Sequence, residues 1–425
     1  MWDKLIRAWQ VKEVRHGLLF VLGMMVIFRI AANLPLPGID LVALRRFFDA
    51  NQVLGLLNLF SGGTIRNFSI VALGVAPYIT ASIIFQLLGM IIPRLEEIQK
   101  DGEAGKQRIN QWTRLLTVPL AIIQSFSLLA LMRQSQVPVL TTTDPLHILM
   151  IIATVTAGSM FLVWIGELIS EKKVGNGISL LIFAGIVASL PESFSQFVST
   201  FDSSQYLTIV LYAIVAVLTV AGVVFVTEGQ RNIPVQYARQ TRGAGGGVGG
   251  VASQLPLRVN MVGVIPIIFA ISLLLFPTIV AQFLTRANNA MVVRAATWVT
   301  VTMQNQLIYG ILYFLLVVGF AYFYTSIVFH PEQVAENLQK QGGFIPGIRP
   351  GRPTAEYLQN IINRITLGGA LFLGAIAVLP IAVQGVVGTQ TLALGGTSML
   401  IVVSVIIESV KQIEAQITMR EYDHY

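Results

Sequence analysis

The sequence predicts an all-α integral membrane protein that crosses its bilayer ten times, with both ends in the cytoplasm. Three observations support this fold class. Of the 425 residues, 54% are hydrophobic and only 12% are charged, whereas soluble domains are about 25% charged. The apolar residues form ten runs of the length, about 20 residues, that spans a hydrocarbon core. The basic residues lie between these runs, mostly on one side.

The first apolar run, 17–34, follows a basic stretch, and this is the general layout of an export signal. Arg29 interrupts the run, however, and no clear Ala-x-Ala cleavage site follows it. We therefore expect an uncleaved first span.

Nine further runs predict the remaining spans. The ninth and tenth are joined by only a few residues that include Gly and Thr, and the end of the fifth is softened by Pro191 and Glu192. The runs fall at about 70–93, 115–133, 146–169, 177–196, 205–227, 259–283, 305–329, 365–386 and 392–410.

The distribution of basic residues sets the expected orientation. With the amino terminus inside, 21 of the 28 Lys and Arg residues lie on cytoplasmic segments, and Arg29 lies within the first span. The other six lie outside, at Arg45, Arg46, Arg66, Arg133, Arg286 and Arg294. The positive-inside rule supports this orientation. The net charge of +7 therefore reflects topology, and it does not indicate nucleic-acid binding.

Three cytoplasmic loops are long: 94–114, 228–258 and 330–364. Basic loops usually do no more than set topology. The length of the second and third, about 30 residues, exceeds what topology requires, which leaves room for a docking surface. The second contains a glycine-rich run, 243–250, that formally matches G-x-G-x-x-G. We predict no strand before it, and Ser-Gln-Leu-Pro follows in place of a helix, so we expect a flexible linker.

One outer loop, 35–69, is unusual. From Leu54 to Phe68 it is apolar at helical spacing, yet it is too short and too polar to span a membrane. We predict a short half-helix that re-enters the membrane level, breaks near Gly74 and continues as the second span, with Pro77 at its start. Such backbone is tolerated only where protein or a water-filled cavity surrounds it. The alternative is a helix lying on the outer surface.

The sequence carries little that would support catalysis or metal binding. It has no Cys, and its four His residues lie at span edges or in terminal segments. We expect no metal, no cofactor and no enzymatic activity. Acidic residues are also missing from the span centres: Glu167 and Glu408 lie at the cytoplasmic ends of spans four and ten. Coupled transporters usually keep acidic groups near the midplane, so this pattern argues against a coupled transporter and is compatible with a passive channel.

Stripes of β-branched residues suggest a lining for such a channel. Val75, Ile79 and Ile83 recur every four residues and share one helix face. Ile178 and Ile182 have the same spacing in the fifth run. Stripes of this kind ordinarily face lipid or packed neighbours, and the residues alone favour that interpretation.

Six motifs are distributed along essentially the whole chain. They are Asn58-Leu-Phe-Ser-Gly-Gly63, Ala72-Leu-Gly-Val-Ala-Pro-Tyr-Ile79, Gly175-Asn-Gly-Ile-Ser179, Leu255-Pro-Leu-Arg-Val-Asn260, Phe344-Ile-Pro-Gly-Ile-Arg-Pro-Gly351 and Gly395-Gly-Thr-Ser398. In sequence and in order these motifs resemble the SecY family, the pore subunits of the bacterial Sec protein translocon. The glycine-rich loop tip and the short tail, which ends at Tyr425, depart from the family pattern.

The resemblance implies an hourglass channel built from two pseudo-symmetric inverted halves of five spans, 1–196 and 197–425. A plug half-helix at about 56–67 would close its outer side, with Leu56, Asn58, Phe60, Gly62, Gly63 and Arg66. An apolar ring would pinch it midway, formed by Val75, Ile79, Ile178, Ile182, Ile268 and Ile401. An apolar constriction of this kind excludes water and ions by dewetting.

The resemblance also implies a lateral gate and a cytoplasmic docking surface. The gate would lie between spans two and three on one side and spans seven and eight on the other, and would include Thr80, Ile83, Gln86, Gln124 and Ser272. Its polar members hold this seam by hydrogen bonds or, alternatively, bond only to their own helices. Arg349 matches a functionally critical arginine of the family. The docking surface would comprise Arg239, Arg242, Arg349 and Arg352.

The expected function is to pass unfolded secretory polypeptides across the bacterial plasma membrane and to release transmembrane segments sideways. The implied partners are the small membrane subunits SecE and SecG, the ATPase SecA, the ribosome, signal peptides, nascent membrane proteins and the lipid bilayer, without direct reading of nucleic acid. The alternative is a small-molecule secondary transporter with inverted repeats.

Overall fold

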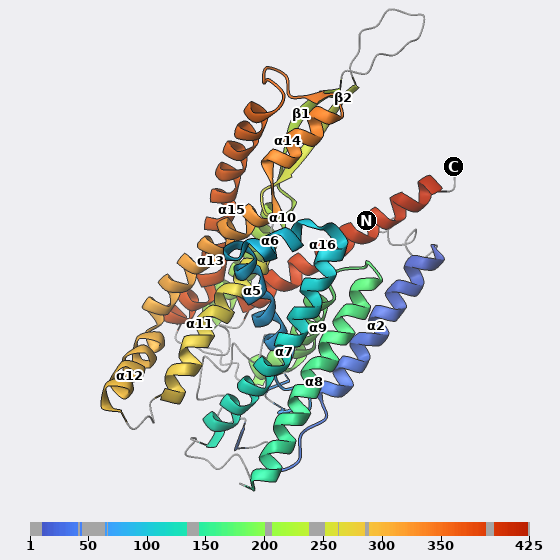
Figure 1. Cartoon of the computed structure of the whole chain (residues 1–425). Helices are drawn as coiled ribbons and strands as arrows, with labels where there is room; N and C mark the ends of the chain where they lie inside the picture. Colours follow the sequence, from blue (N-terminus) through green and yellow to red (C-terminus); the bar gives the residue numbers. More distant parts are fainter. Residues whose placement is uncertain are drawn as a thin grey trace, which may run out of the picture. The chain divides into compact units, whose positions relative to one another are not determined.

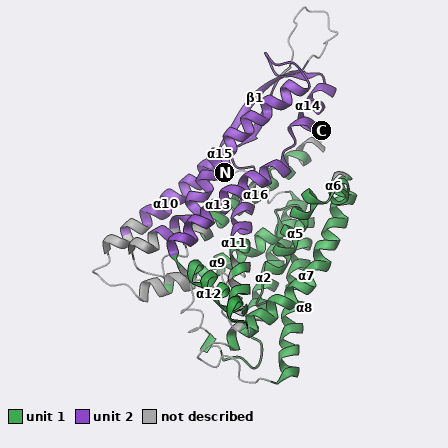
Figure 2. Cartoon of the chain, turned by 60° about the vertical axis from the view of Figure 1, so that its left-hand side comes forward, with its two compact units in different colours: residues 1–207, 271–305, 389–425 green, residues 208–270, 306–388 purple. Residues whose placement is uncertain are grey.

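The computed structural model describes residues 11–40, 43–44, 64–65, 67–133, 144–199, 206–237, 251–261, 263–284, 289–387 and 395–423. Figure 1 shows the whole chain, coloured along the sequence. The chain divides into two units that interleave along the sequence (Figure 2). The first comprises 1–207, 271–305 and 389–425, and the second comprises 208–270 and 306–388. The division into halves at 196/197 stays a prediction.

Each of the ten predicted spans overlaps a helix of the structure. These helices are α2 (Lys12–Ala32), α5 (Ala76–Ile91), α7 (Gly102–Arg133), α8 (Pro145–Glu171), α9 (Gly177–Ser199), α10 (Tyr206–Glu228), α11 (Ile265–Leu284), α13 (Gln306–Val328), α15 (Arg352–Val387) and α16 (Gly395–Asp423). Within the described ranges, the stretches on α2, α7, α8, α13 and α15 are by themselves long and apolar enough to cross a membrane.

The predicted cytoplasmic loop 94–114 is largely helical. α6 (Pro93–Lys100) follows α5 directly and bends away from it by 109°. α7 begins at Gly102, well before its apolar stretch, because the Glu, Lys, Gln and Arg residues that follow are good helix formers. Hydropathy therefore marks the part of a helix that lies in lipid and does not mark where the helix starts.

In the first unit, neighbouring helices pack in sequence: α5 against α7, α7 against α8, and α8 against α9 (Figure 1). α2 packs against α8 and α9, and α16 packs against α9 and α2. A core cluster joins the segment before α5 to the C-terminal end of α7 and the N-terminal part of α8. Its buried members include Leu36, Leu44, Ile65, Phe68, Ala72, Leu129, Met132, Ile151 and Val155.

The segment before α5 is irregular, and its backbone groups find partners inside the protein. The Leu36 amide donates to the Phe68 carbonyl at 3.0 Å, and the Ile70 amide donates to the Leu34 carbonyl at 3.0 Å. The Thr64 hydroxyl donates to the Ala72 carbonyl at 3.0 Å. This satisfies the requirement that irregular backbone at membrane depth be enclosed by protein.

The predicted break at Gly74 is confirmed. Gly74 has φ +58°, in the left-handed region that glycine adopts readily, and α5 starts two residues later with Pro77 in its first turn. The part of the predicted half-helix that is described, Thr64, Ile65 and Asn67, forms turns. The six residues named for the plug, Leu56, Asn58, Phe60, Gly62, Gly63 and Arg66, lie outside the described residues.

The second unit is built on α13 and α15, which pack along each other. Gly310 faces Val378, and Gly374 faces the ring of Phe314, so small residues let the two helices approach closely. The Gln306 side-chain amide donates to the Ile381 carbonyl at 3.0 Å. Phe269, from α11, contacts the rings of Phe320 and Tyr324 edge to face.

A three-stranded sheet lies within the predicted loops 228–258 and 330–364. β1 (Gln230–Tyr237) pairs with β2 (Val251–Arg258) and, on its other side, with β3 (Gly343–Phe344), all antiparallel. α14 (Pro331–Lys340) lies beside β1 (Figure 1), and α14 and the start of α15 share a core with the sheet. The core includes Ile233, Val235, Leu257, Leu338, Ile345, Leu358, Ile361 and Ile362.

The expectation that no strand precedes the glycine-rich run is therefore wrong, because β1 ends at Tyr237. The alternation Ile233, Val235, Tyr237 has the period of a strand, but Pro234 argues against a strand in a sequence pattern. The strand leads into an antiparallel hairpin and not into a helix, so the dinucleotide fingerprint still lacks its helix.

Candidate functional site

Four of the predicted ring residues are buried in the first unit, at the start of α5 and on α9 and α16. Val75 and Ile79 are 3% and 7% exposed and follow directly on the Gly74 break. Ile182 on α9 and Ile401 on α16 are each 2% exposed. α9 and α16 pack against each other. The structure therefore places apolar, β-branched side chains inside the unit and not toward lipid.

The other two ring residues have different surroundings. Ile178 is half-buried, and its side chain reaches toward α8: a Cβ added at Gly166 would lie 2.7 Å from the Ile178 Cδ1. Ile268 is 7% exposed and belongs to the second unit, where it lies near the start of α11. That all six side chains converge at one level stays a prediction.

The polar gate residues of α5 bond within their own helix. The Thr80 hydroxyl donates to the Ala76 carbonyl at 3.0 Å, and the Gln86 side-chain amide donates to the Ser82 hydroxyl at 3.1 Å. Gln124 on α7 and Ser272 on α11 are half-buried, and Ile83 is buried. Thr80 and Gln86 therefore follow the alternative expectation, in which a polar side chain bonds only to its own helix.

An aromatic contact between α5 and α7 was not predicted from the sequence. The rings of Phe85 and Trp112 lie 6.3 Å apart at an interplanar angle of 30°. Trp112 falls in the segment 94–114, which the sequence analysis takes as a loop. Recognition that α7 starts at Gly102 would bring this residue onto a helix beside the second span.

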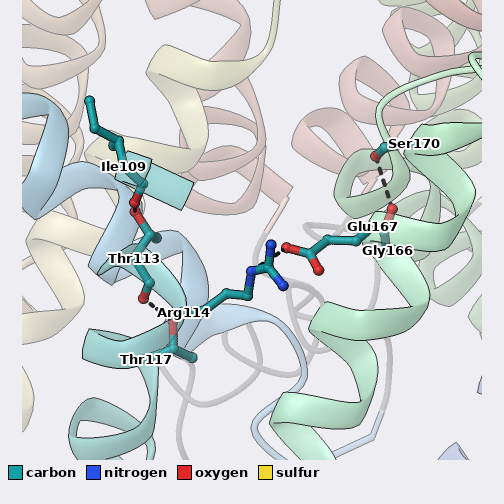
Figure 3. Close-up of polar contacts among 7 residues, drawn as sticks. All are labelled: Ile109, Thr113, Arg114, Thr117, Gly166, Glu167 and Ser170. Atoms are coloured by element: carbon teal, nitrogen blue, oxygen red, sulfur yellow. Dashed lines mark hydrogen bonds and ion pairs between the residues drawn. The ribbon is translucent and has the colours of Figure 1, made fainter. Parts of the chain in front are cut away.

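An ion pair joins α7 to α8. The Arg114 Nε lies 2.8 Å from the Glu167 Oε1, with the two side chains 44% and 27% exposed (Figure 3). Around it, the Thr113 and Thr117 hydroxyls donate back to carbonyls of their own helix (Figure 3). The sequence could have indicated this pair, because Arg114 lies at the start of the third predicted span and Glu167 at the end of the fourth. Consecutive spans run in opposite directions, so these two ends lie at the same depth.

Arg349 stands on a turn whose backbone is held in place. Gly347 and Gly351 have φ +83° and +95°, and the Ile348 amide donates to the Ile345 carbonyl at 3.0 Å. The buried Thr354 hydroxyl donates to the Arg349 carbonyl at 2.9 Å. The Arg349 side chain is exposed.

Of the other three predicted docking residues, the structure describes only Arg352. Arg352 Nε lies 3.3 Å from the Glu356 Oε1, one turn along α15, and both side chains are strongly exposed. An exposed pair of this kind contributes little to stability. Arg239 and Arg242 lie outside the described residues.

The fold and the buried apolar side chains after a broken second span define a polytopic helical membrane protein of the channel-forming class. The SecY family model matches residues 69–410. Protein translocase subunit SecY of Streptomyces scabiei is 42% identical, over 99% of this chain and 98% of that protein. The Mycobacterium tuberculosis protein of the same name is 40% identical over the full length of both. This chain belongs to the SecY family.

Solved structures share the fold. One described as a protein conducting channel matches with a TM-score of 0.64 and 17% identity, covering 93% of this chain and 91% of that chain. Sec61 in a canine ribosome-channel complex matches with a TM-score of 0.60, 17% identity and the same coverage. The predicted fold class, an all-α membrane protein with ten spans, is confirmed.

Proposed function

We propose that this chain, a protein-conducting channel of the SecY family, passes unfolded secretory polypeptides through a ring of apolar side chains and releases transmembrane segments through a lateral gate. The observation that carries the proposal is the burial of Val75 and Ile79 immediately after the Gly74 break. Membership of a protein translocase family rules out the alternative of a small-molecule transporter.

The ring seals the resting channel. Buried isoleucine and valine side chains offer water and ions no replacement for their hydration shells, so a narrow apolar constriction dewets. A polypeptide passes by pushing these side chains aside, and the ring closes around it. The chain has no catalytic role in this process, and a cytosolic partner supplies the energy.

The outer seal is the plug at about 56–67. The enclosed backbone of the described residues that follow it supports this assignment, because the segment enters α5 from within the protein. Deletion of 56–67 should raise the ion conductance of reconstituted bilayers while much of export is preserved. An unchanged conductance in a deletion variant that is folded and inserted would argue against a sealing plug.

The gate and the docking surface complete the proposal. The lateral gate lies between spans two and three on one side and spans seven and eight on the other, and includes Thr80, Ile83, Gln86, Gln124 and Ser272. The Phe85–Trp112 contact packs the two helices of the first side, α5 and α7, against each other. The ordered turn at Arg349 presents a cation to SecA or the ribosome, together with Arg239, Arg242 and Arg352. SecE and SecG are the expected membrane partners, and the chain resides in the bacterial plasma membrane with both ends in the cytoplasm.

Site-specific crosslinking tests the ring directly. A photoreactive residue is placed at Ile79, Ile182 or Ile268, and a secretory chain is stalled during transport. We expect crosslinks from all three positions to the stalled chain. Phe225 on α10, which is 80% exposed, serves as a lipid-facing control and should not crosslink. If the Phe225 position crosslinks as strongly as the ring positions, the proposed path is wrong.

A further inference from the structure

The connection between α8 and α9, residues 170–177, is here called the elbow. α8 and α9 approach so closely at this point that a Cβ on Gly177 would overlap the carbonyl oxygen of Gly166. The Ser170 hydroxyl bridges the two helices: it donates to the Gly166 carbonyl and accepts from the Gly177 amide, each at 2.9 Å. The Asn176 Oδ1 then accepts from the Ser179 amide at 3.2 Å in the first turn of α9.

The far end of the chain holds this elbow from the other side. The Gln416 side-chain amide on α16 donates to the carbonyls of Lys172 and Lys173, at 3.2 Å and 2.7 Å. These carbonyls belong to the end of α8, where backbone acceptors lack partners within the helix. Lys173 has φ +56°, which is uncommon for a residue with a side chain, so its conformation needs support from its surroundings.

α2 completes the enclosure of the elbow. Gly17 lies against Val174, which is 3% exposed, and the Lys172 Nζ lies 4.9 Å from the centroid of the Phe20 ring. Val14 on α2 and Ile417 on α16 form a shared apolar cluster beside it. All of these residues belong to the first unit (Figure 2). The elbow is thus contacted by both α2 and α16, the first and the last of the described helices.

We propose that Gln416 is a positioning residue for the pore ring, a role that rests on the proposed function. Gln416 and Ile401 lie on the same helix, about 22 Å apart along its axis. The carbonyls that Gln416 holds lie just before α9, which carries Ile178 in its first turn and Ile182 one turn later. The two hydrogen bonds set the start of α9 relative to α16, and thereby the fit of Ile182 against its neighbours in the closed ring.

The test uses the absence of cysteine from the chain. A single cysteine is introduced at Ile182, and its labelling by a water-soluble thiol reagent is timed in membranes that contain the full channel. Gln416→Leu removes both donors, and Gln416→Ala does so with a smaller side chain. We expect each to raise the labelling rate roughly tenfold, as follows from the loss of one or two hydrogen bonds, and to raise resting ion conductance. Gln412→Leu makes the same change one turn earlier on α16 and should leave both unchanged.

A ring variant, Ile401→Ser, separates the two possible failures. If Ile401→Ser leaks ions while both Gln416 variants match Gln412→Leu, the ring stands and the positioning role of Gln416 is wrong. If Ile401→Ser leaks no more than the unmodified channel, the ring itself is wrong and the positioning role fails with it. Equal leakage from the Gln416 and Gln412 variants would likewise overturn the proposal, because it would show a general effect of altering α16.

Discussion

At the residue scale, two helical glycines have opposite requirements. Gly177 faces the Gly166 carbonyl across the elbow, with no room for a Cβ, whereas Gly368 on α15 has no heavy atom within 4 Å of a built Cβ. Gly177→Ala should therefore lower stability by about 1–3 kcal/mol, as expected for overpacking. Gly368→Ala should raise it by about 0.5–1 kcal/mol, because alanine loses less backbone entropy in a helix.

The measurement is the thermal unfolding midpoint of the two purified variants in detergent, compared with the unmodified chain. The matched pair controls for the change in composition, since both variants replace glycine with alanine within a helix. A Gly177→Ala variant as stable as Gly368→Ala would show that α8 and α9 do not approach as closely as described.

Arg349 is the second residue whose effect can be predicted. Arg349→Glu should lower SecA-driven transport into proteoliposomes by roughly tenfold or more, because a like charge at a docking surface replaces attraction with repulsion. The Thr354 bond is to the Arg349 backbone, so the turn should stay folded. Arg364→Glu makes the same charge change at an exposed site on α15 and should transport normally. Wild-type transport by Arg349→Glu would make Arg349 a topology residue only.

At the element scale, the contact between α7 and α8 depends on one charged pair beside apolar packing. Arg114→Glu and Glu167→Arg should each destabilise the channel by about 1 kcal/mol, a modest value because both side chains are partly exposed. The double exchange restores opposite charges at the same positions. We expect it to recover most of the loss in thermal stability. Losses that simply add in the double variant would mean that the pair contributes nothing.

Sequence patterns predict the membrane helices well and the structure around them poorly. A run of apolar residues is a local property, so each of the ten predicted spans overlaps a helix. Strand pairing is not local, since β1 meets β3 more than a hundred residues later, and Pro234 obscures the alternation within β1. α12 (Ala290–Gln304) was missed because it is too short to span a membrane and lies within a predicted outer loop.

In the candidate site too, local features could be predicted from the sequence and contacts between distant residues could not. Burial of Val75, Ile79, Ile182 and Ile401 follows from motif position and helical spacing. The contacts of Gln416 with the elbow could not be predicted from the sequence, because they join residues 243 and 244 positions apart. The contact of Ile178 with Gly166 could not be predicted either, because it depends on how closely α8 and α9 approach.

At the scale of the whole molecule, the orientation in the membrane is the property that the charges predict. A fluorescent protein fused after Asp423 should fold and emit, because such proteins mature in the cytoplasm. Alkaline phosphatase inserted between α12 and α13, near Asn305, should be active, because it requires export. Activity of the phosphatase when it replaces the fluorescent protein at the carboxyl end would reverse the predicted orientation.

The small sheet has a consequence for the timing of biosynthesis. The β1–β2 hairpin is complete at Arg258, but much of its core comes from α14 and α15, and α14 begins only at Pro331, about 70 residues later. An isolated two-stranded hairpin is marginally stable in water. At a synthesis rate of roughly 5–20 residues per second, the hairpin waits several seconds for its covering helices. During that interval its apolar face is open to chaperones and proteases, so slow elongation through α11 to α13 should lower the yield of channel.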